Sequence, residues 1–291
     1  MTAGTGVATG VRLAGTELSR EIRARVSASA AALTAAGRPP RLTVVVATTD
    51  ESTAWYVRSI AGAAAKVGIA CDVVHLGDDA DGEEIEAALR RLSDDPAVHG
   101  IILQTPLPAG VGVARAATAI DPRKDVDGSN PVSLGRLAAG LPAFPPATAQ
   151  AVVALLEHYD IPLAGRNAVV VGRSTVVGKP LAHLLLDRDA TVTVCHSRTA
   201  HLAESTRRAD VLVAAVGLVG LIGNEHVHPA SVVIDVGTNA TDDGGLVGDV
   251  DPAVEEHAAS LTPVPGGVGP VTTALLLEHT VRAAEKRDGS R

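Results

Sequence analysis

Short apolar runs alternate along the chain with longer segments of helical periodicity. In the first helical segment, Leu18, Ile22, Val26 and Leu33 fall mostly on one face, and Thr16 is placed to cap it. Runs that are apolar throughout are typical of strands covered on both faces of a parallel sheet. The expected strands are residues 42–47, 71–76, 100–103, 169–171, 191–195, 211–215 and 232–236, and further helices are expected near 51–67, 83–92, 148–159 and 271–286. This alternation predicts an α/β fold with parallel sheets.

The chain is long enough for two domains that each bury a core. A proline-rich segment, Pro142–Pro146, predicts the junction between them. We therefore expect a first domain over residues 1–147 and a second over 148–270, followed by a closing helical segment, 271–291.

One strand is followed by a glycine turn and a helical pattern, in residues 169–180 (VVVGRSTVVGKP). A glycine turn in this context can hold a phosphate on backbone N–H groups at a helix N-terminus. The spacing G-x-S-x-x-x-G fits the dinucleotide fingerprint only loosely. The next strand ends in residues 196–199 (HSRT), so Arg173, Ser197 and Arg198 offer donors where a ribose 2′-phosphate would lie, without a competing carboxylate. The pattern favours an NADP site over an NAD site; a surface loop with ordinary basic residues is the alternative.

Composition narrows the function classes. The net charge of −8 and the lack of a basic stripe argue against nucleic acid as a partner. No apolar run reaches the length of a bilayer span and no signal sequence is visible, which predicts a cytoplasmic protein with no membrane partner. Cys71 and Cys195 have no metal-ligand spacing, so we expect buried reduced thiols and no metal.

Two loops stand out for their composition. Residues 121–128 (DPRKDVDG) are densely charged, and charge density alone predicts a solvated turn there. Residues 262–270 (TPVPGGVGP) are dense in glycine and proline. The pair Trp55–Tyr56 is also conspicuous in a chain with one Phe, one Trp and two Tyr; core packing is its alternative explanation.

Taken together, several motifs resemble the methylenetetrahydrofolate dehydrogenase/cyclohydrolase family. They are Gln104–Pro108 (QTPLP), Lys124–Gly128 (KDVDG), residues 171–180, residues 233–237 (VIDVG) and the 262–270 loop. The resemblance runs from about residue 10 to 285. It implies a folate-binding α/β domain, a Rossmann-type NADP domain, a C-terminal helix that returns to the first domain, a catalytic cleft between the domains and a homodimer.

The family resemblance also implies a chemistry. Hydride passes from the methylene carbon that bridges N5 and N10 of tetrahydrofolate to NADP⁺, and water then opens the methenyl product to 10-formyltetrahydrofolate. On this basis Tyr56, Gln104 and Asp127 are the expected catalytic and substrate-binding side chains. Asp127 suits the paired donors of a pterin edge, and the low bulk of Pro265, Gly266 and Gly267 suits close approach to the substrate. The expected cofactor residues are Gly172, Arg173, Ser174, Ser197 and Thr238.

The sequence departs from the family at one decisive position. The family's first-domain motif is S-x-x-Y-V-x-x-K, and its lysine is tied to the cyclohydrolase step. Here Thr53 and Tyr56 keep the register, and Ile60 stands at the lysine position. Neither Arg58 nor Lys66 falls on the same helical face as Ile60. A water-attack step needs an acid–base group, so we predict a dehydrogenase with weak or absent cyclohydrolase activity.

Two other hypotheses stay open. A duplicated family member could act on another pterin-like or one-carbon substrate, and smaller departures at Thr48, Ala147, Ala149 and Val219 bear on substrate details. The third hypothesis is a non-catalytic folate- or NADP-binding protein, against which retention of Gln104, Asp127 and the 262–270 loop argues.

Overall fold

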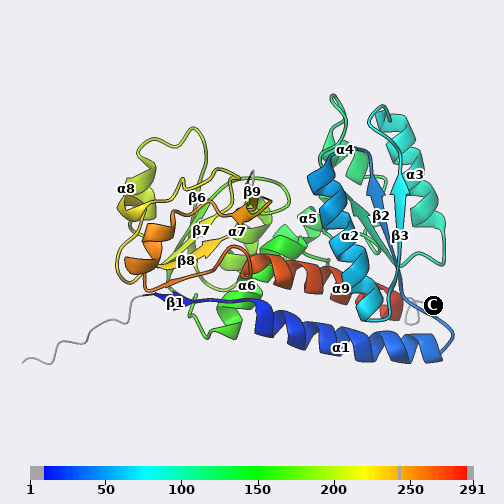
Figure 1. The fold of residues 1–291 in the computed structure, drawn as a ribbon, viewed down its shortest axis with the longest axis horizontal. Helices are drawn as coiled ribbons and strands as arrows, with labels where there is room; N and C mark the ends of the chain where they lie inside the picture. The colour runs from blue at the N-terminus through cyan, green and yellow to red at the C-terminus, as the bar shows by residue number, and fades with distance from the viewer. Residues whose placement is uncertain (1–9, 242–243, 287–291) are drawn as a thin grey trace, which may run out of the picture. The chain divides into compact units, whose positions relative to one another are not determined.

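The computed structural model describes residues 10–241 and 244–286, which form two compact units. Residues 10–18 and 148–272 make the six-stranded unit; residues 19–147 and 273–286 make the three-stranded unit. Each unit has its own sheet and is described by itself. The sheets and their helices confirm the predicted α/β class (Figure 1).

The sheet of the three-stranded unit is parallel throughout, in the order β3-β2-β4. Its strands are β2 (Arg41–Val46), β3 (Ala70–His75) and β4 (Gly100–Leu103). The central strand β2 is buried at every position except Arg41, and β4 is wholly buried. This is the reason that both strands read as continuous apolar runs.

The helices of this unit begin at side-chain caps. Asp50 and Asp81 accept the backbone N–H groups of Thr53 and Glu84, and so start α2 and α3. The helices are α1 (Thr16–Ala35), α2 (Glu51–Lys66), α3 (Gly82–Asp94), α4 (Val113–Ala117), α5 (Pro131–Ala138) and, from Thr273 on, α9 (Val268–Lys286). Figure 1 shows α1 and α9 side by side, where Arg25 and Glu278 form an ion pair.

The larger sheet has the order β1-β11-β8-β7-β5-β6 and is also parallel. Its strands are β1 (Val11–Arg12), β5 (Asn167–Val171), β6 (Thr191–Cys195), β7 (Val211–Ala214), β8 (Val232–Asp235) and β11 (Ser260–Leu261). A separate antiparallel pair joins β9 (Asn239–Ala240) to β10 (Leu246–Val247). The helical segments of this unit are α6 (Ala147–His158), α7 (Gly178–Leu186), α8 (Leu202–Thr206), η1 (Asn224–His226) and η2 (Pro252–Glu256).

The N-terminal segment differs from the sequence expectation. The sequence predicts one domain over residues 1–147, whereas the structure places residues 10–18 in the six-stranded unit. The reason is that Val11 and Arg12 pair in parallel with Ser260 and Leu261. A two-residue strand carries no periodicity that a sequence analysis could recognise. Residues 1–9 of that expectation lie outside the described part of the chain.

Among the described residues, none of the helices combines the length and the apolar character required to cross a bilayer.

Candidate functional site

The glycine turn lies where the order of the six-stranded sheet reverses. The chain passes from β5 to β6 on one side and returns to β7 on the other, so the ends of β5 and β7 mark a topological switch point. Gly172 follows β5 with φ of 130°, and a Cβ there would stand 2.2 Å from the carbonyl oxygen of Ala215. At Gly178 a Cβ would stand 2.1 Å from the oxygen of Gly172. Only glycine lets the strand ends and the start of α7 approach this closely.

The side chains around this turn have different tasks. Ser174 Oγ accepts the backbone N–H groups of Val177 at 3.1 Å and Gly178 at 3.4 Å, so it shapes the start of α7. Arg173, Ser197 and Arg198 are exposed. Because β5 and β6 pair in register, the residues that follow both strands lie at one edge of the sheet. That edge presents two guanidinium groups and a hydroxyl, donors that suit a phosphate.

Two buried aspartates organise the neighbouring loops, and the sequence analysis did not single them out. Asp249 accepts the backbone N–H groups of Val216, Gly217 and Leu218 at 2.7, 3.0 and 2.9 Å. Asp235 accepts those of Gly237, Asp249 and Val250 at 2.9 to 3.0 Å. Burial raises the pKa of Asp235, and these backbone donors oppose the rise. The only sequence signal was that Asp235 lies inside the 233–237 motif.

The glycine- and proline-rich loop belongs to the six-stranded unit. The backbone N–H of Gly15 donates to the oxygen of Gly266 at 2.8 Å, and a Cβ on Gly15 would stand 2.1 Å from the oxygen of Gly267. Pro265, Gly266 and Gly267 are thus packed on the backbone that precedes α1. Thr238 is exposed after β8, at the same carboxyl edge of the sheet as Gly172.

Tyr56, Gln104 and Asp127 all belong to the three-stranded unit. Gln104 directly follows β4, Tyr56 lies near the start of α2, and Asp127 follows a segment in which Asp125 bridges to Ile101 of β4. Burial, and then the negative charge of Asp127, raise the pKa of the Tyr56 phenol. Burial and the charge of Asp125 raise the pKa of Asp127 to about 7, although the backbone N–H of Ala147 opposes this. Gln104, Tyr56 and Asp127 therefore give the three-stranded unit an amide, a phenol and an acid with a pKa near neutrality.

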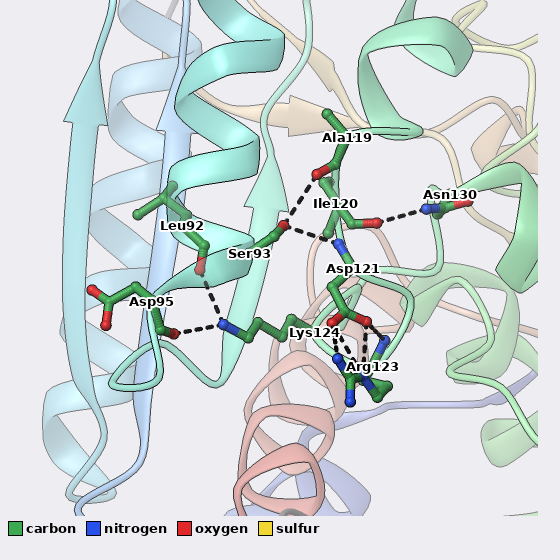
Figure 2. Close-up of polar contacts among 9 residues, drawn as sticks. All are labelled: Leu92, Ser93, Asp95, Ala119, Ile120, Asp121, Arg123, Lys124 and Asn130. Carbon is green, nitrogen blue, oxygen red and sulfur yellow. Dashed lines mark hydrogen bonds and ion pairs between the residues drawn. The ribbon is translucent and has the colours of Figure 1, made fainter.

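The charged stretch 121–128 is not the solvated turn that its charge density suggests. Lys124 is 4% exposed and Asp125 is fully buried. Figure 2 shows Lys124 reaching past the end of α3, where its Nζ donates to the carbonyl oxygens of Leu92 at 3.1 Å and Asp95 at 2.6 Å. A cation at the carboxyl end of a helix is favourable. The charges in this stretch therefore serve to fix the backbone that leads to Asp127.

Asp125 also holds the backbone around Asp127, through hydrogen bonds to the residues that follow it. Its carboxylate accepts the backbone N–H groups of Ser129 and Asn130 and the hydroxyl of Ser133, at 2.6 to 2.9 Å. Nδ1 of the buried His279, on α9, lies 2.7 Å from the carbonyl oxygen of Val126. Burial lowers the pKa of His279 to about 4. Sequence reasoning missed His279, because a single histidine in a helical pattern carries no functional signal.

Ile60 is fully buried in α2, whereas Arg58 and Lys66 are exposed, as the helical spacing predicted. Trp55 is 58% exposed, so core packing does not explain Trp55, whereas Tyr56 is half-buried. An apolar, fully enclosed side chain therefore occupies the position at which the family motif predicts a lysine.

The cysteines and the metal-ligand types give no further site. Cys195 is buried, but Cys71 is only half-buried on the edge strand β3, which corrects the expectation for that residue. Both are free thiols. Within the part of the chain that the structure describes, His, Cys, Asp and Glu form no cluster of three or more that could hold a metal ion.

Comparison with known proteins decides the family. Residues 13–127 match the model of the tetrahydrofolate dehydrogenase/cyclohydrolase catalytic domain, and residues 146–288 match that family's NAD(P)-binding domain. The chain belongs to this family. The NAD(P)-binding match contains the Gly172 and Gly178 turn, and the catalytic match contains Tyr56, Gln104 and Asp127.

Individual relatives agree with that membership. The chain is 67% identical to bifunctional protein FolD 1 of Saccharopolyspora erythraea over 96% of this chain and 95% of the relative, and 63% identical to that of Rhodococcus jostii over 94% and 92%. The crystal structure of the bifunctional enzyme from Campylobacter jejuni superposes with a TM-score of 0.92 at 39% identity, covering 95% of this chain and 99% of that one. A Trypanosoma brucei family structure complexed with NADP and an inhibitor has a TM-score of 0.91 at 35% identity, covering 97% and 99%.

Proposed function

We propose that this family member is an NADP-dependent 5,10-methylenetetrahydrofolate dehydrogenase whose cyclohydrolase step is weak or lost. One observation carries the proposal: Tyr56, Gln104 and Asp127 are retained at the sheet edge, while the enclosed Ile60 takes the place of the lysine. The name of the bifunctional enzyme from Campylobacter jejuni gives both activities, and the proposal departs from it only at the second.

The glycine cradle fits a dinucleotide. At both Gly172 and Gly178 a Cβ would collide with the protein's own backbone oxygens, so strand and helix meet in a tight turn, as in a dinucleotide-binding motif. Arg173, Ser197 and Arg198 then face the position of a 2′-phosphate, which favours NADP over NAD. Ser174 and Asp249 shape the loops, and Thr238 offers a hydroxyl at the same edge. When bound, NADP⁺ supplies the hydride acceptor.

The substrate residues act mainly by orientation. The Asp127 carboxylate accepts paired N–H donors of a pterin edge, and Tyr56 presents a flat ring to the substrate. Gln104 adds a neutral amide that orients its neighbours without adding charge near a cationic product. For Pro265, Gly266 and Gly267, the proposal rests on the family motif and on their low side-chain bulk. Hydride transfer depends chiefly on this positioning, because the two reacting centres need proximity rather than a proton relay.

Cyclohydrolase chemistry makes a different demand. Attack of water on the methenyl product requires a group that moves a proton, and such groups typically contribute about 10²–10⁴-fold. An isoleucine side chain has no ionisable group, and the exposed Arg58 and Lys66 lie on other faces of α2. The proposal therefore separates the two activities at a single residue.

The test follows purified protein with 5,10-methylenetetrahydrofolate and NADP⁺ in a spectrophotometer that records NADPH and the methenyl chromophore together. We expect NADPH to form while methenyl accumulates and decays at its rate in buffer. If NADPH rises without methenyl accumulating, the loss of cyclohydrolase activity is disproved. If neither signal changes, the chain acts on another substrate or none, and the dehydrogenase proposal fails.

The sheet edge at β6 supports a homodimer. β6 is an edge strand in which Thr191, Thr193 and Val194 are exposed, so its free backbone groups can pair with another strand. Leu186, at the end of the adjacent α7, is 52% exposed. We expect light scattering to give twice the chain mass, and Val194→Lys to shift it toward the monomer. A monomeric wild-type protein would refute the proposed dimer, but it would not bear on the proposed dehydrogenase activity.

A further inference from the structure

A cavity of about 650 Å³ lies in the three-stranded unit, at the opposite end of β4 from the proposed substrate residue Gln104. His99, which precedes β4, lines this cavity, whereas Gln104, which follows β4, marks the substrate edge. The two places are therefore at opposite ends of one buried strand. The cavity is also lined by the 121–124 turn, by α5, by the 142–144 segment and by the last turn of α9. Its volume is within the range of about 300–1,000 Å³ that is typical of small-molecule sites.

The lining combines apolar walls with basic groups. Pro122, Pro142, Ala143, Phe144 and Ala283 supply the apolar surface. Arg123, Lys124, Arg136 and Lys286 bring four positive charges, against two negative charges from Asp121 and Glu285. The sign of this patch is opposite to that of the whole chain, which carries −8.

Not all of these cations are available to a ligand. Arg123 is held by the Asp121 carboxylate, with an Nη2 to Oδ2 distance of 2.6 Å (Figure 2), and Lys124 is committed to the end of α3. Arg136 uses Nε to donate to the carbonyl oxygen of Pro142 at 2.9 Å; its terminal nitrogens have no partner among the described residues. The Lys286 ammonium lies 5.1 Å from the centroid of the Phe144 ring. Arg136 and Lys286 are thus the donors that remain at the exposed rim.

We propose that this cavity binds an organic anion: a phosphate or carboxylate group, held by Arg136 and Lys286, on an apolar body that packs against Phe144 and the proline walls. A guanidinium and an ammonium on the rim favour an anionic group. The apolar walls favour a body that leaves water, so neither part of the ligand alone satisfies the site.

The cavity wall is connected to Asp127 on both sides. The ring of Phe144 lies 5.0 Å, between centroids, from the ring of His279, which contacts the carbonyl oxygen of Val126. On the other side, a Cβ on Gly128 would stand 2.7 Å from the carbonyl oxygen of Phe144, so these backbones are in close contact. A ligand that displaces Phe144 therefore alters the contacts that reach Val126, through His279, and Gly128, the two neighbours of Asp127. The effect on turnover rests on the proposed function, but the binding does not.

The experiment measures binding directly, with NADP⁺ at saturation so that the cofactor edge is filled. Phenyl phosphate and phthalate are titrated into isotope-labelled protein while the backbone amide signals of Ala143 and Ala283 are followed by NMR. Phenol and inorganic phosphate serve as ligands that each lack one half of the chemistry. We expect saturable shifts with at least one of the two organic anions, and the stronger binder identifies a phosphate ester or a carboxylate as the natural head group.

Matched variants localise the site. Arg136→Gln and Lys286→Gln should each raise the Kd about tenfold, as expected for loss of one charged contact. Arg90→Gln, which removes an exposed charge on α3, should leave the Kd unchanged. No shift in the wild-type protein, an unchanged Kd in both variants, or equal binding of phenol overturns the site. If the organic anion binds but saturating anion leaves the KM for the folate substrate unchanged, only the link to Asp127 is overturned. If the protein has no dehydrogenase activity, the proposed function fails, but the binding measured by NMR still stands.

Discussion

The carboxylate of Asp235 accepts the backbone N–H of Asp249 at 3.0 Å, and both side chains are buried. This bond places the Asp249 carboxylate beneath the loop that follows β7, where it accepts three successive backbone N–H groups. The loop belongs to the same carboxyl edge as Gly172. A buried acid therefore fixes backbone at the edge for which we propose cofactor binding.

Asp249→Asn should weaken cofactor binding and lower stability. The amide presents an N–H₂ to donors that need an acceptor, and the loss of a hydrogen bond to a carboxylate costs about 1.5–3 kcal/mol. We expect a lower free energy of unfolding in urea and a raised KM for NADP⁺, with the KM for the folate substrate little changed. Asp251→Asn is the control, since Asp251 caps η2 at the surface. An unchanged KM for NADP⁺ would restrict Asp249 to a purely structural task.

Asp127 should make stability fall and substrate binding improve as the pH rises. Its pKa of about 7 exceeds the ordinary 3.8, so the native state keeps this proton between those values while the unfolded chain has lost it. Its contribution to stability therefore falls as pH rises from about 4 to 7. Ionised Asp127 is the better acceptor for the pterin donors, so the KM for the folate substrate should fall as pH rises through 7.

Asp127→Asn checks both effects at once. The difference in unfolding free energy between wild type and variant should change across pH 4 to 7, because the raised pKa is absent from the variant. The variant should also lose kcat/KM and the pH dependence of its KM. Asp121→Asn, in the same turn, serves as the control. A KM that rises with pH in the wild type would contradict the assigned role.

Ile60→Lys tests the residue that we propose separates the two activities. Ile60 is fully buried, so an ammonium there is desolvated and the variant should have a lower Tm than Ile60→Met, which keeps an apolar chain. If the folded variant admits water at this position, methenyl should no longer accumulate during NADPH formation. Circular dichroism and the two-wavelength assay give both answers. Methenyl accumulation in a folded Ile60→Lys protein would show that further residues block the second step.

Lys124→Met should destabilise the three-stranded unit by about 1–3 kcal/mol, because two carbonyl oxygens at the end of α3 lose the buried ammonium that donates to them. Arg123→Met removes a neighbouring charge from an exposed pair and should cost less than about 1 kcal/mol. Urea unfolding of both variants measures the difference. Equal losses would mean that burial of Lys124 contributes nothing beyond a surface ion pair.

Long periodic elements were predictable from sequence because each carries its own signal. The expected strand 42–47 became Arg41–Val46, and the closing helix 271–286 became Val268–Lys286. The glycine turn was also predictable, because Gly172 and Gly178 lie in one short segment that joins a strand pattern to a helical pattern. The roles of Tyr56, Gln104 and Asp127 remain predictions that rest on the family motifs.

By itself the sequence determined the fold class, the turn at Gly172 and the apolar Ile60, because period, local sterics and residue type are properties of short segments. Only the tertiary structure decided that Val11 and Arg12 join the β11 edge, that Lys124 and Asp125 are buried, and that His279 meets Val126 across 153 positions. Burial and long-range pairing depend on which segments meet in space. A stretch as charged as 121–128 can therefore be read correctly only once its partners at the end of α3 are known.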